Sequence, residues 1–251
     1  MSFARSALVV AATLLGSIVS VGAAALILLF KDRLLDAVTS KLIPYAIGTL
    51  LGAAFIGMIP EALTRLNGDS VLTSVLAGIV LFYVLEKLAL WRHCHEKTCD
   101  VHTQAGTMIL IGDSIHNFVD GVAIAVAFTA SLPLGIATAV AVVTHEVPQE
   151  VGDFAILLHS GFSRSRALLF NMLSSLTAVI GAVLALLLLP VTQSFVPYLL
   201  SLSAGSFIYI ALADLVPGRR STGGLRSLAW ELPLILLGGG TILALHQLAA
   251  H

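Results

Sequence analysis

The chain has 251 residues, of which 58% are hydrophobic and only 11% are charged, and its mean hydropathy is +1.00. A soluble domain carries about 25% charged residues, so this composition excludes an ordinary soluble enzyme or binding domain. The net charge of −1 gives no basis for nucleic-acid binding. The apolar residues come in long runs, which is typical of a protein that crosses a membrane several times.

Eight stretches of the chain are long and apolar enough to be membrane spans, each of which needs about 20 mostly apolar residues. We predict helices over residues 7–30, 42–64, 71–91, 105–129, 133–159, 166–189, 196–216 and 229–249. The fourth and fifth qualify only if their polar residues face the bundle interior. Because the loops are short, the sequence predicts one all-α membrane domain over residues 1–251. The first stretch exceeds a signal-peptide core, so no cleavable leader is predicted.

The basic residues predict how the bundle is oriented, because lysine and arginine concentrate in cytoplasmic loops. Eleven of the 13 lie in or beside the four loops that follow spans 1, 3, 5 and 7. These are Lys31, Arg33, Lys41, Lys87, Arg92, Lys97, Arg164, Arg166, Arg219, Arg220 and Arg226. Only Arg5 and Arg65 fall on the other side. We therefore predict that both termini lie outside the cytoplasm, which requires an even number of spans.

Spans 4 and 5 each contain a run of polar residues. Residues three or four apart share one face of a helix, so each run forms a stripe. The stripe on span 4 consists of Asp113, His116, Asn117 and Asp120. The stripe on span 5 consists of His145, Glu146, Gln149, Glu150 and Asp153. Pro148 removes a helical hydrogen bond and predicts a kink near the second stripe.

The two stripes together predict a metal site inside the membrane. Ionisable side chains in a span are costly and usually mark an ion path. Imidazole suits zinc, iron and nickel, whereas carboxylate and amide oxygens accept harder ions. The stripes offer enough ligands for two neighbouring ions that share a carboxylate. We place Asp113, Glu150 and Asp153 on the transport path, although Asp113 and Asp153, at the stripe ends, fit a helix-packing role equally well.

These residues also carry a family resemblance. His-Asn-Phe-x-Asp-Gly from His116, followed by His-Glu-x-Pro-Gln-Glu-x-Gly-Asp-Phe from His145, resembles the ZIP (Zrt/Irt-like) family of divalent metal transporters. Residues 51–61, 82–86, 91–95 and 204–214 resemble the family's second span, third span, following loop and seventh span. The paired motifs of spans 4 and 5 are the specific part of the resemblance.

The resemblance implies uptake of a divalent metal into the cytoplasm through the plasma (inner) membrane. The metal would be Zn²⁺, or else Fe²⁺, Mn²⁺ or Cd²⁺, carried as substrate with no cofactor. It implies a bundle with inverted repeats of spans 1–3 and 6–8, a homodimer, and elevator-type movement of spans 1, 4, 5 and 6 against a scaffold. It implies a binuclear site with six ligands: His116, Asn117, Asp120, His145, Glu146 and Gln149.

The sequence departs from the family pattern at three positions. Gln149 stands where the subgroup with this fifth-span motif often has histidine. Gly57 stands where many members place a histidine before the Pro-Glu pair, and Gly218 follows Pro217 where an acidic residue is common. The first departure changes one ligand of the central site, while the other two affect its entrance or exit.

The loop between spans 3 and 4 is a second metal candidate. It carries three histidines and two cysteines within ten residues, namely His93, Cys94, His95, Cys99 and His102. Thiolate is a soft ligand that favours zinc, although this spacing fits no standard structural zinc site. Weak metal binding and a solvated loop without metal are equally consistent with this composition.

Two other classes of protein compete with a transporter. His145-Glu146-Val-Pro-Gln149 is similar to the His-Glu-x-x-His helix of zinc proteases, so an intramembrane metalloprotease is the alternative. Gln149 replaces the second histidine of that motif, and the first stripe would have no protease role. A metal-sensing receptor would need an output domain, which the sequence does not supply. We therefore expect no enzymatic activity.

Overall fold

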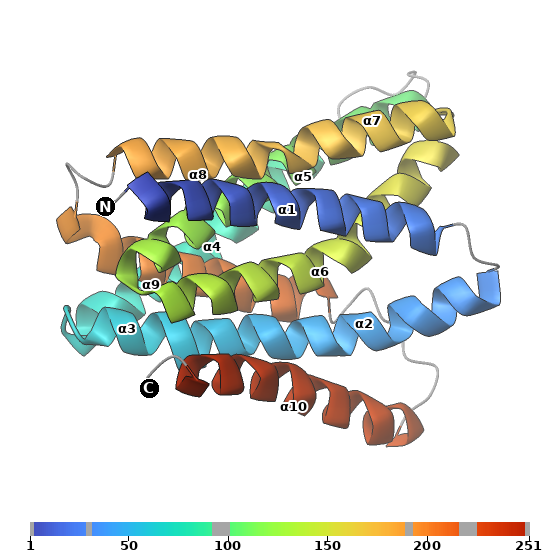
Figure 1. The fold of residues 1–251 in the computed structure, drawn as a ribbon. Coiled ribbons are helices and arrows are strands. Elements are labelled where there is room, and N and C mark those ends of the chain that lie inside the picture. The colour runs from blue at the N-terminus through green and yellow to red at the C-terminus, as the bar shows by residue number, and fades with distance from the viewer. Residues whose placement is uncertain (1–2, 29–31, 92–100, 189–192, 216–224, 249–251) are drawn as a thin grey trace.

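The computed structural model describes residues 3–28, 32–91, 101–188, 193–215 and 225–248, which form helices and no β-strand (Figure 1). In chain order the elements are α1 (Phe3–Ile27), α2 (Asp32–Gly52), η1 (Ala53–Met58), α3 (Ile59–Leu63), α4 (Gly68–Trp91), α5 (Val101–Ala130), α6 (Leu132–His159), α7 (Arg164–Ser175), α8 (Thr177–Leu188), η2 (Gln193–Phe195), α9 (Val196–Tyr209), η3 (Ile210–Leu215) and α10 (Leu225–Leu248). The all-helical class predicted from the sequence is confirmed for these residues.

Seven helical stretches of the described chain are long and apolar enough to cross a membrane. The predicted span 133–159 coincides with α6, which is 28 residues long but is not one of the seven. Its hydropathy is lowered by the polar stripe around His145, Glu146 and Gln149. The total of eight spans stays a prediction, and α6 is the helix on which it depends.

Three predicted spans are not continuous α-helices. The second contains the π-helical turn η1 between α2 and α3, and the seventh ends in the π-helical turn η3 after α9. The sixth is divided at Leu176 into α7 and α8. π-Turns and breaks interrupt the regular hydrogen-bond ladder and often accompany functional sites. By contrast, α6 continues through Pro148.

Local sequence signals explain where several helices begin. The side chain of Asn67 accepts a hydrogen bond from the Ser70 backbone N–H at 2.8 Å, just before the first full turn of α4. The hydroxyl oxygens of Ser131 and Ser163 accept backbone hydrogen bonds at the starts of α6 and α7. Side-chain caps satisfy N–H groups that the first helical turn leaves without partners.

Glycines let the helices approach each other closely. A Cβ atom on Gly121 of α5 would clash with the carbonyl oxygen of Ala178 on α8, and one on Gly181 of α8 would clash with that of Phe118 on α5. The same reciprocal arrangement joins α2 to α10 at Gly48 and Gly238, and α4 to α9 at Gly78 and Gly205. Small residues at helix crossings are the usual means of close packing in a membrane.

A substitution at one of these crossings should destabilise the bundle. In Gly181→Ala, the new methyl group must displace the backbone of α5, and overpacking of this kind costs about 1–3 kcal/mol. Gly240→Ala on α10 is the matched control, because nothing lies within 4 Å of its added Cβ. We expect thermal unfolding in detergent to show a lower Tm for Gly181→Ala only. Equal Tm values would contradict the close α5–α8 packing.

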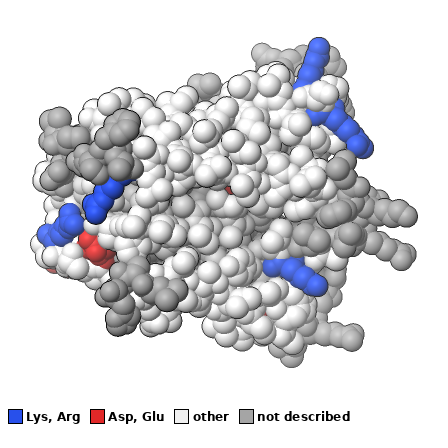
Figure 2. Space-filling view, in the orientation of Figure 1, with Lys and Arg blue, Asp and Glu red and all other residues white. Residues whose placement is uncertain are grey.

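The surface of the bundle is uncharged in the middle and carries charged side chains near its ends. Lys and Arg side chains appear near the two ends in Figure 2, with a wide uncharged surface between them. Large apolar side chains such as Leu15, Leu72, Leu187 and Leu236 are exposed on the bundle. The start of α1 and the end of α10 lie at the same end of the bundle (Figure 1). This surface is suited to a lipid environment.

Candidate metal centre

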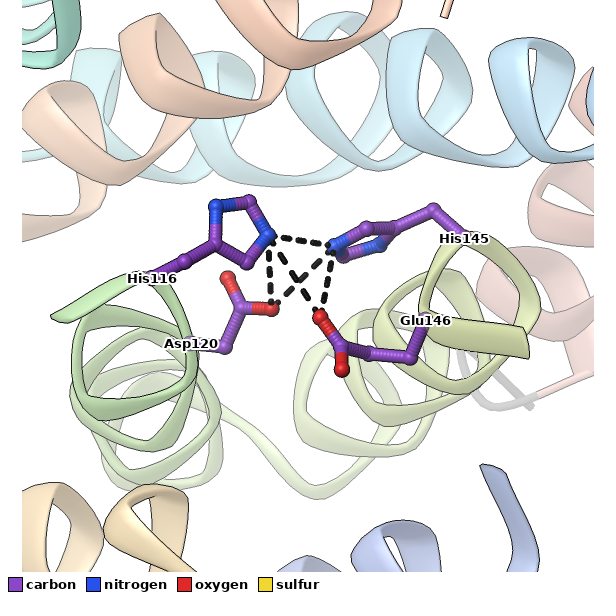
Figure 3. A group of neighbouring side chains, drawn as sticks. All are labelled: His116, Asp120, His145 and Glu146. Atoms are coloured by element: carbon purple, nitrogen blue, oxygen red, sulfur yellow. Dashed lines mark hydrogen bonds and ion pairs between the residues drawn. The ribbon is translucent and has the colours of Figure 1, made fainter. Parts of the chain in front are cut away.

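Four side chains of α5 and α6 point toward one another in the middle of the bundle (Figure 3). His116 and Asp120 come from α5, one helical turn apart, and His145 and Glu146 come from α6. One ligand atom from each lies within 4.8 Å of all the others. Asp120, His145 and Glu146 are buried, and the His116 side chain is 12% exposed. The two stripes predicted from periodicity therefore do face each other.

The distances between the ligand atoms match a single metal coordination sphere. His116 Nε2 lies 3.1 Å from His145 Nε2, 3.7 Å from Asp120 Oδ2 and 3.4 Å from Glu146 Oε1. His145 Nε2 lies 3.2 Å from Asp120 Oδ2 and 3.5 Å from Glu146 Oε1. Zinc–ligand bonds of about 2.0–2.1 Å in tetrahedral geometry place neighbouring ligand atoms about 3.3 Å apart. The four atoms thus fit around one ion with little rearrangement.

A backbone hydrogen bond orients one of the imidazoles. His145 Nδ1 lies 3.0 Å from the carbonyl oxygen of Ala141, one turn earlier on α6. Since a carbonyl only accepts, Nδ1 carries the proton, and the Nε2 lone pair of the neutral ring points into the cluster. Metal-ligating histidines are commonly held by a second hydrogen bond of this kind.

A second group of ligand atoms adjoins the first. Asp113, Glu146 and Glu150 bring carboxylate oxygens within 4.8 Å of one another, and all three are buried. Glu146 belongs to both groups. Asp113 and Glu150, which the sequence analysis places on the transport path, therefore lie against the central cluster. Asp153 is also buried but belongs to neither group.

The two predicted amide ligands contact Asp113. Asn117 Nδ2 donates to Asp113 Oδ1 at 2.9 Å, and Gln149 Nε2 donates to the same oxygen at 3.3 Å. Within the described part of the chain, the Gln149 Oε1 atom is buried and accepts no hydrogen bond. The two amides therefore hold one carboxylate oxygen of Asp113, and the Gln149 oxygen remains available to an ion.

Neighbouring helices supply contacts that the sequence analysis did not predict. The rings of Phe82 on α4 and Phe207 on α9 pack edge-on against His116 and His145, with centroids 5.9 and 6.1 Å apart. Thr49 of α2 and Thr144 of α6 share a hydrogen bond of 2.7 Å beside His145. Their only sequence signal is a polar or aromatic residue in an apolar span, which helix packing explains equally well.

A small cavity adjoins Glu146 on the side of α1. Its polar lining consists of Thr13, Ser17, Ser20, Asn117 and Glu146. The hydroxyl groups of the first three donate to backbone carbonyls, which leaves their lone pairs available. The cavity has room for about one water molecule. The site therefore has space for a water molecule that accompanies an ion.

The loop candidate cannot be placed in this arrangement. His93, Cys94, His95 and Cys99 lie outside the described residues, and of His102 the structure describes only the backbone, in the first turn of α5. In the described part of the chain, the groups with metal-ligand geometry are the two at α5 and α6.

The fold and the site together define an integral membrane protein with a metal-ligand cluster between two central helices. Comparison with known proteins identifies the family. Residues 91–246, more than half of the chain, match the family described as ZIP Zinc transporter. The chain belongs to the ZIP family, as the motifs of spans 4 and 5 predict.

Named relatives agree with this assignment. The chain is 43% identical to zinc transporter ZIP4 of Mus musculus over 145 residues, which are 56% of this chain and 22% of that protein. It is 44% identical to ZIP10 of Danio rerio and 43% to ZIP6 of Homo sapiens, each over 110 residues, or 44% of this chain. Those regions are 13% and 15% of the respective relatives, so the chain matches only a small part of each.

Neither the comparisons nor the geometry support the protease alternative. The relatives are named transporters. At the position of the protease motif's second histidine, the Gln149 amide donates to Asp113.

Proposed function

We propose that this chain transports divalent metal cations across a membrane into the cytoplasm, with zinc as the principal substrate. The observation that carries the proposal is the four-ligand cluster of His116, Asp120, His145 and Glu146, whose interatomic distances suit one ion. Two imidazoles and two carboxylates suit zinc and also accept Fe²⁺, Mn²⁺ or Cd²⁺. The cluster contains no thiolate, so the bound ion is not held by the softest ligands and can be released.

The proposed site is binuclear, with Glu146 shared between the two ions. The proximity of the Asp113, Glu146 and Glu150 carboxylates to the first cluster supports this arrangement. Asn117 and Gln149, which the family resemblance assigns as ligands, contact Asp113, and the free Gln149 oxygen can complete a coordination sphere. Asp153 is proposed as a residue of the transport path.

The proposed topology has eight spans, with α6 as the fifth and both termini outside the cytoplasm. The shared position of the start of α1 and the end of α10 supports an even number of crossings (Figure 1). α6 also runs along the bundle, packed between α1, α2 and α5 (Figure 1). The polar stripe of α6 faces α5, so lipid need not contact it. The plasma (inner) membrane and a homodimer complete the proposal.

An inverted repeat of spans 1–3 and 6–8 is supported by the way the helices pair. Span 2 packs on span 8 as span 7 packs on span 3, and span 1 packs on span 5 as span 6 packs on span 4. In addition, η1 begins five residues after Gly48, and η3 begins five residues after Gly205. In the sequence, Pro60 and Pro217 each follow those glycines by twelve residues. These correspondences are what two related halves predict.

The mechanism we propose is alternating access of the elevator type. An ion from outside exchanges water for His116, Asp120, His145 and Glu146. α1, α5, α6 and the α7–α8 pair then move together against a scaffold of α2, α4, α9 and α10. Close glycine crossings within each group support this division, because Gly121 and Gly181 join α5 to α8, whereas Gly78 and Gly205 join α4 to α9.

Metal uptake into proteoliposomes tests this function. The purified chain should show saturable uptake of zinc, and parallel assays with iron, manganese and cadmium will rank the substrates. His145→Ala should reduce uptake at least about 100-fold. Loss of a residue that only hydrogen-bonds to a metal ligand already lowers metal affinity or activity about 10–100-fold. Uptake that is absent for every ion, or unaffected by His145→Ala, would contradict the proposal.

A further inference from the structure

A chain of hydrogen-bonding groups connects His145 of the metal-ligand cluster to the neighbouring helix α2. His145 Nδ1 lies 3.0 Å from the carbonyl oxygen of Ala141, and the hydroxyl oxygen of Thr144 lies 2.9 Å from the same atom. Thr144 Oγ1 is also 2.7 Å from Thr49 Oγ1 of α2, which is itself 2.9 Å from the carbonyl oxygen of Ala46. The chain therefore crosses the boundary between the proposed moving helices and the proposed scaffold.

The number of protons limits how these groups can pair. Each hydroxyl carries one proton, whereas a backbone carbonyl only accepts. If both threonines donated to the carbonyls of their own helices, no proton would lie between two hydroxyl oxygens that are 2.7 Å apart. One of the two threonines must therefore donate to the other.

The Ala141 carbonyl determines which threonine donates across the boundary. A carbonyl oxygen has two lone pairs. On Ala141 one of them accepts the helical N–H from four residues later in α6, and the other faces His145 Nδ1. On Ala46 the helical N–H of α2 takes one lone pair and leaves the other for Thr49. Every group is satisfied when Thr144 donates to Thr49, and Thr49 donates to Ala46.

Separation of α6 from α2 would change this arrangement. A threonine in a helix donates readily to the carbonyl three or four residues earlier. Without Thr49, the proton of Thr144 would turn to the Ala141 carbonyl, three residues earlier, and compete there with His145 Nδ1. The imidazole would then be held less firmly in its orientation toward the other ligands.

Pro148 makes the backbone of α6 deformable at this position. Proline has no N–H, so the carbonyl of Thr144, four residues earlier, lacks its helical hydrogen bond. The backbone at Thr144 is therefore held less tightly than in an uninterrupted helix. A shift of Thr144 at the boundary with α2 can thus reach His145, which is the next residue.

We infer that Thr144 is a positioning residue that makes the metal affinity of the histidine cluster depend on contact between α6 and α2. While α6 lies against Thr49, Thr144 donates away from Ala141, and His145 is held for metal binding. Once the helices separate, Thr144 competes for that carbonyl and the affinity falls. The inference rests on the proposed function and deepens it, because it gives the transported ion a tight and a loose state. By reciprocity, a bound ion favours the state in which α6 contacts α2.

The zinc affinity of two threonine variants tests the inference on the purified full-length chain. Bound Co²⁺ has a visible spectrum that reports imidazole ligation, so its displacement by zinc measures the zinc Kd at the histidine cluster. Thr49→Val leaves Thr144 to compete for the Ala141 carbonyl and should raise this Kd about 10-fold, the lower end of the effect of losing a hydrogen bond behind a metal ligand. Thr144→Val removes the competing hydroxyl and should leave the Kd at or below the wild-type value.

Combined variants and a matched control separate positioning from packing. The double variant Thr49→Val, Thr144→Val should have the affinity of Thr144→Val, because the competing hydroxyl is gone. Thr49→Val with Thr144→Ser should have the weaker affinity of Thr49→Val, because serine restores the hydroxyl. Thr138→Val is the matched control and should keep the wild-type Kd. Thr138 is buried on α6, and its hydroxyl has no hydrogen-bond partner within the described chain.

The outcomes distinguish this inference from the transport function. The Co²⁺ spectrum should persist in every variant, which excludes misfolding. A loss of affinity in Thr144→Val as well, additive in the double variant, would identify a packing contact and overturn the inference. An unchanged Kd in Thr49→Val would also overturn it. Transport stands in both cases if the wild-type chain binds zinc and takes it up into proteoliposomes. A wild-type chain that neither binds nor transports any ion would overturn both proposals.

Discussion

Zinc uptake by the Asp120→Ala protein should fall at least about 100-fold, because this carboxylate lies against both imidazoles of the cluster. Asp120 Oδ2 is 3.2 Å from His145 Nε2 and 3.7 Å from His116 Nε2. Within the described chain, neither Asp120 oxygen is hydrogen-bonded. The proposed role of Asp120 is therefore to bind an ion, and we expect it to contribute little to the fold of the metal-free protein.

Stability measurements separate these two roles. Asp120→Asn replaces a buried charge by a neutral amide of similar size, and its N–H can donate to the lone pair on His145 Nε2. We expect the Tm of the metal-free variant to equal or exceed that of the wild type, with a gain of about 1 kcal/mol at most. Zinc at a concentration of 100 times its Kd should stabilise the wild-type protein by about 2.7 kcal/mol and so raise its Tm. It should not raise the Tm of the variant.

A different result would identify a structural residue. If the metal-free Asp120→Asn protein unfolds at a lower temperature and zinc still stabilises it, then Asp120 supports the helix packing and the site assignment is wrong. Asp69→Asn is the matched carboxylate-to-amide control, because Asp69 is exposed in the first turn of α4 and belongs to neither ligand group. Its uptake and its response to zinc should both equal those of the wild type.

Much of the central site could be predicted because it depends on helical periodicity. His116 and Asp120 are four residues apart, and so are His145 and Gln149, so any long helix places each pair on one face. The cost of leaving such groups in lipid then requires the two faces to meet. The structure confirms this meeting, because ligand atoms from both helices lie within 4.8 Å of one another.

Periodicity does not determine which atoms of a polar side chain face which neighbour. The sequence predicts Asn117 and Gln149 as ligands, whereas their amide nitrogens contact Asp113. The grouping of Glu150 with Asp113 depends on how α5 and α6 are rotated about their axes, and packing against other helices sets that rotation. Contacts between distant parts of the chain, such as those of Gly121 and Gly181 at the α5–α8 crossing, help to fix it.

The interruptions within the helices could not be predicted from the sequence either. Hydropathy treats the second, sixth and seventh spans as uniform apolar runs, because a π-turn or a break changes hydrogen bonding without changing composition. The break at Leu176 lies where Thr177 donates a hydrogen bond to the Ser114 carbonyl of α5 at 2.6 Å. This contact joins residues 63 positions apart, so no local pattern predicts it.

Locking α6 to α2 should stop transport if the two helices belong to bodies that move relative to each other. Thr49 Oγ1 of α2 and Thr144 Oγ1 of α6 are 2.7 Å apart. Cysteines at these two positions therefore have the proximity that a disulfide requires. The background is Cys94→Ser with Cys99→Ser, which removes both native cysteines. We expect oxidation of the Thr49→Cys, Thr144→Cys pair to reduce uptake to the level of empty liposomes, and reduction to restore it.

The neighbouring residue on α6 provides a matched control. A Cβ on Gly16 of α1 would lie 3.1 Å from Val143 Cγ2, so the Gly16→Cys, Val143→Cys pair also permits a cross-link. Since α1 and α6 belong to the same proposed moving body, this disulfide should leave uptake near the wild-type rate. Both cross-links lie within one residue of each other on α6 and differ in the helix they reach. If neither cross-link blocks uptake, α6 does not move against α2 and the elevator mechanism is wrong. If both block uptake, α1 and α6 do not move as one body and the proposed division of the helices is wrong. A block confined to the α2–α6 pair would place the sliding boundary between α2 and α6, beside the proposed ligand His145.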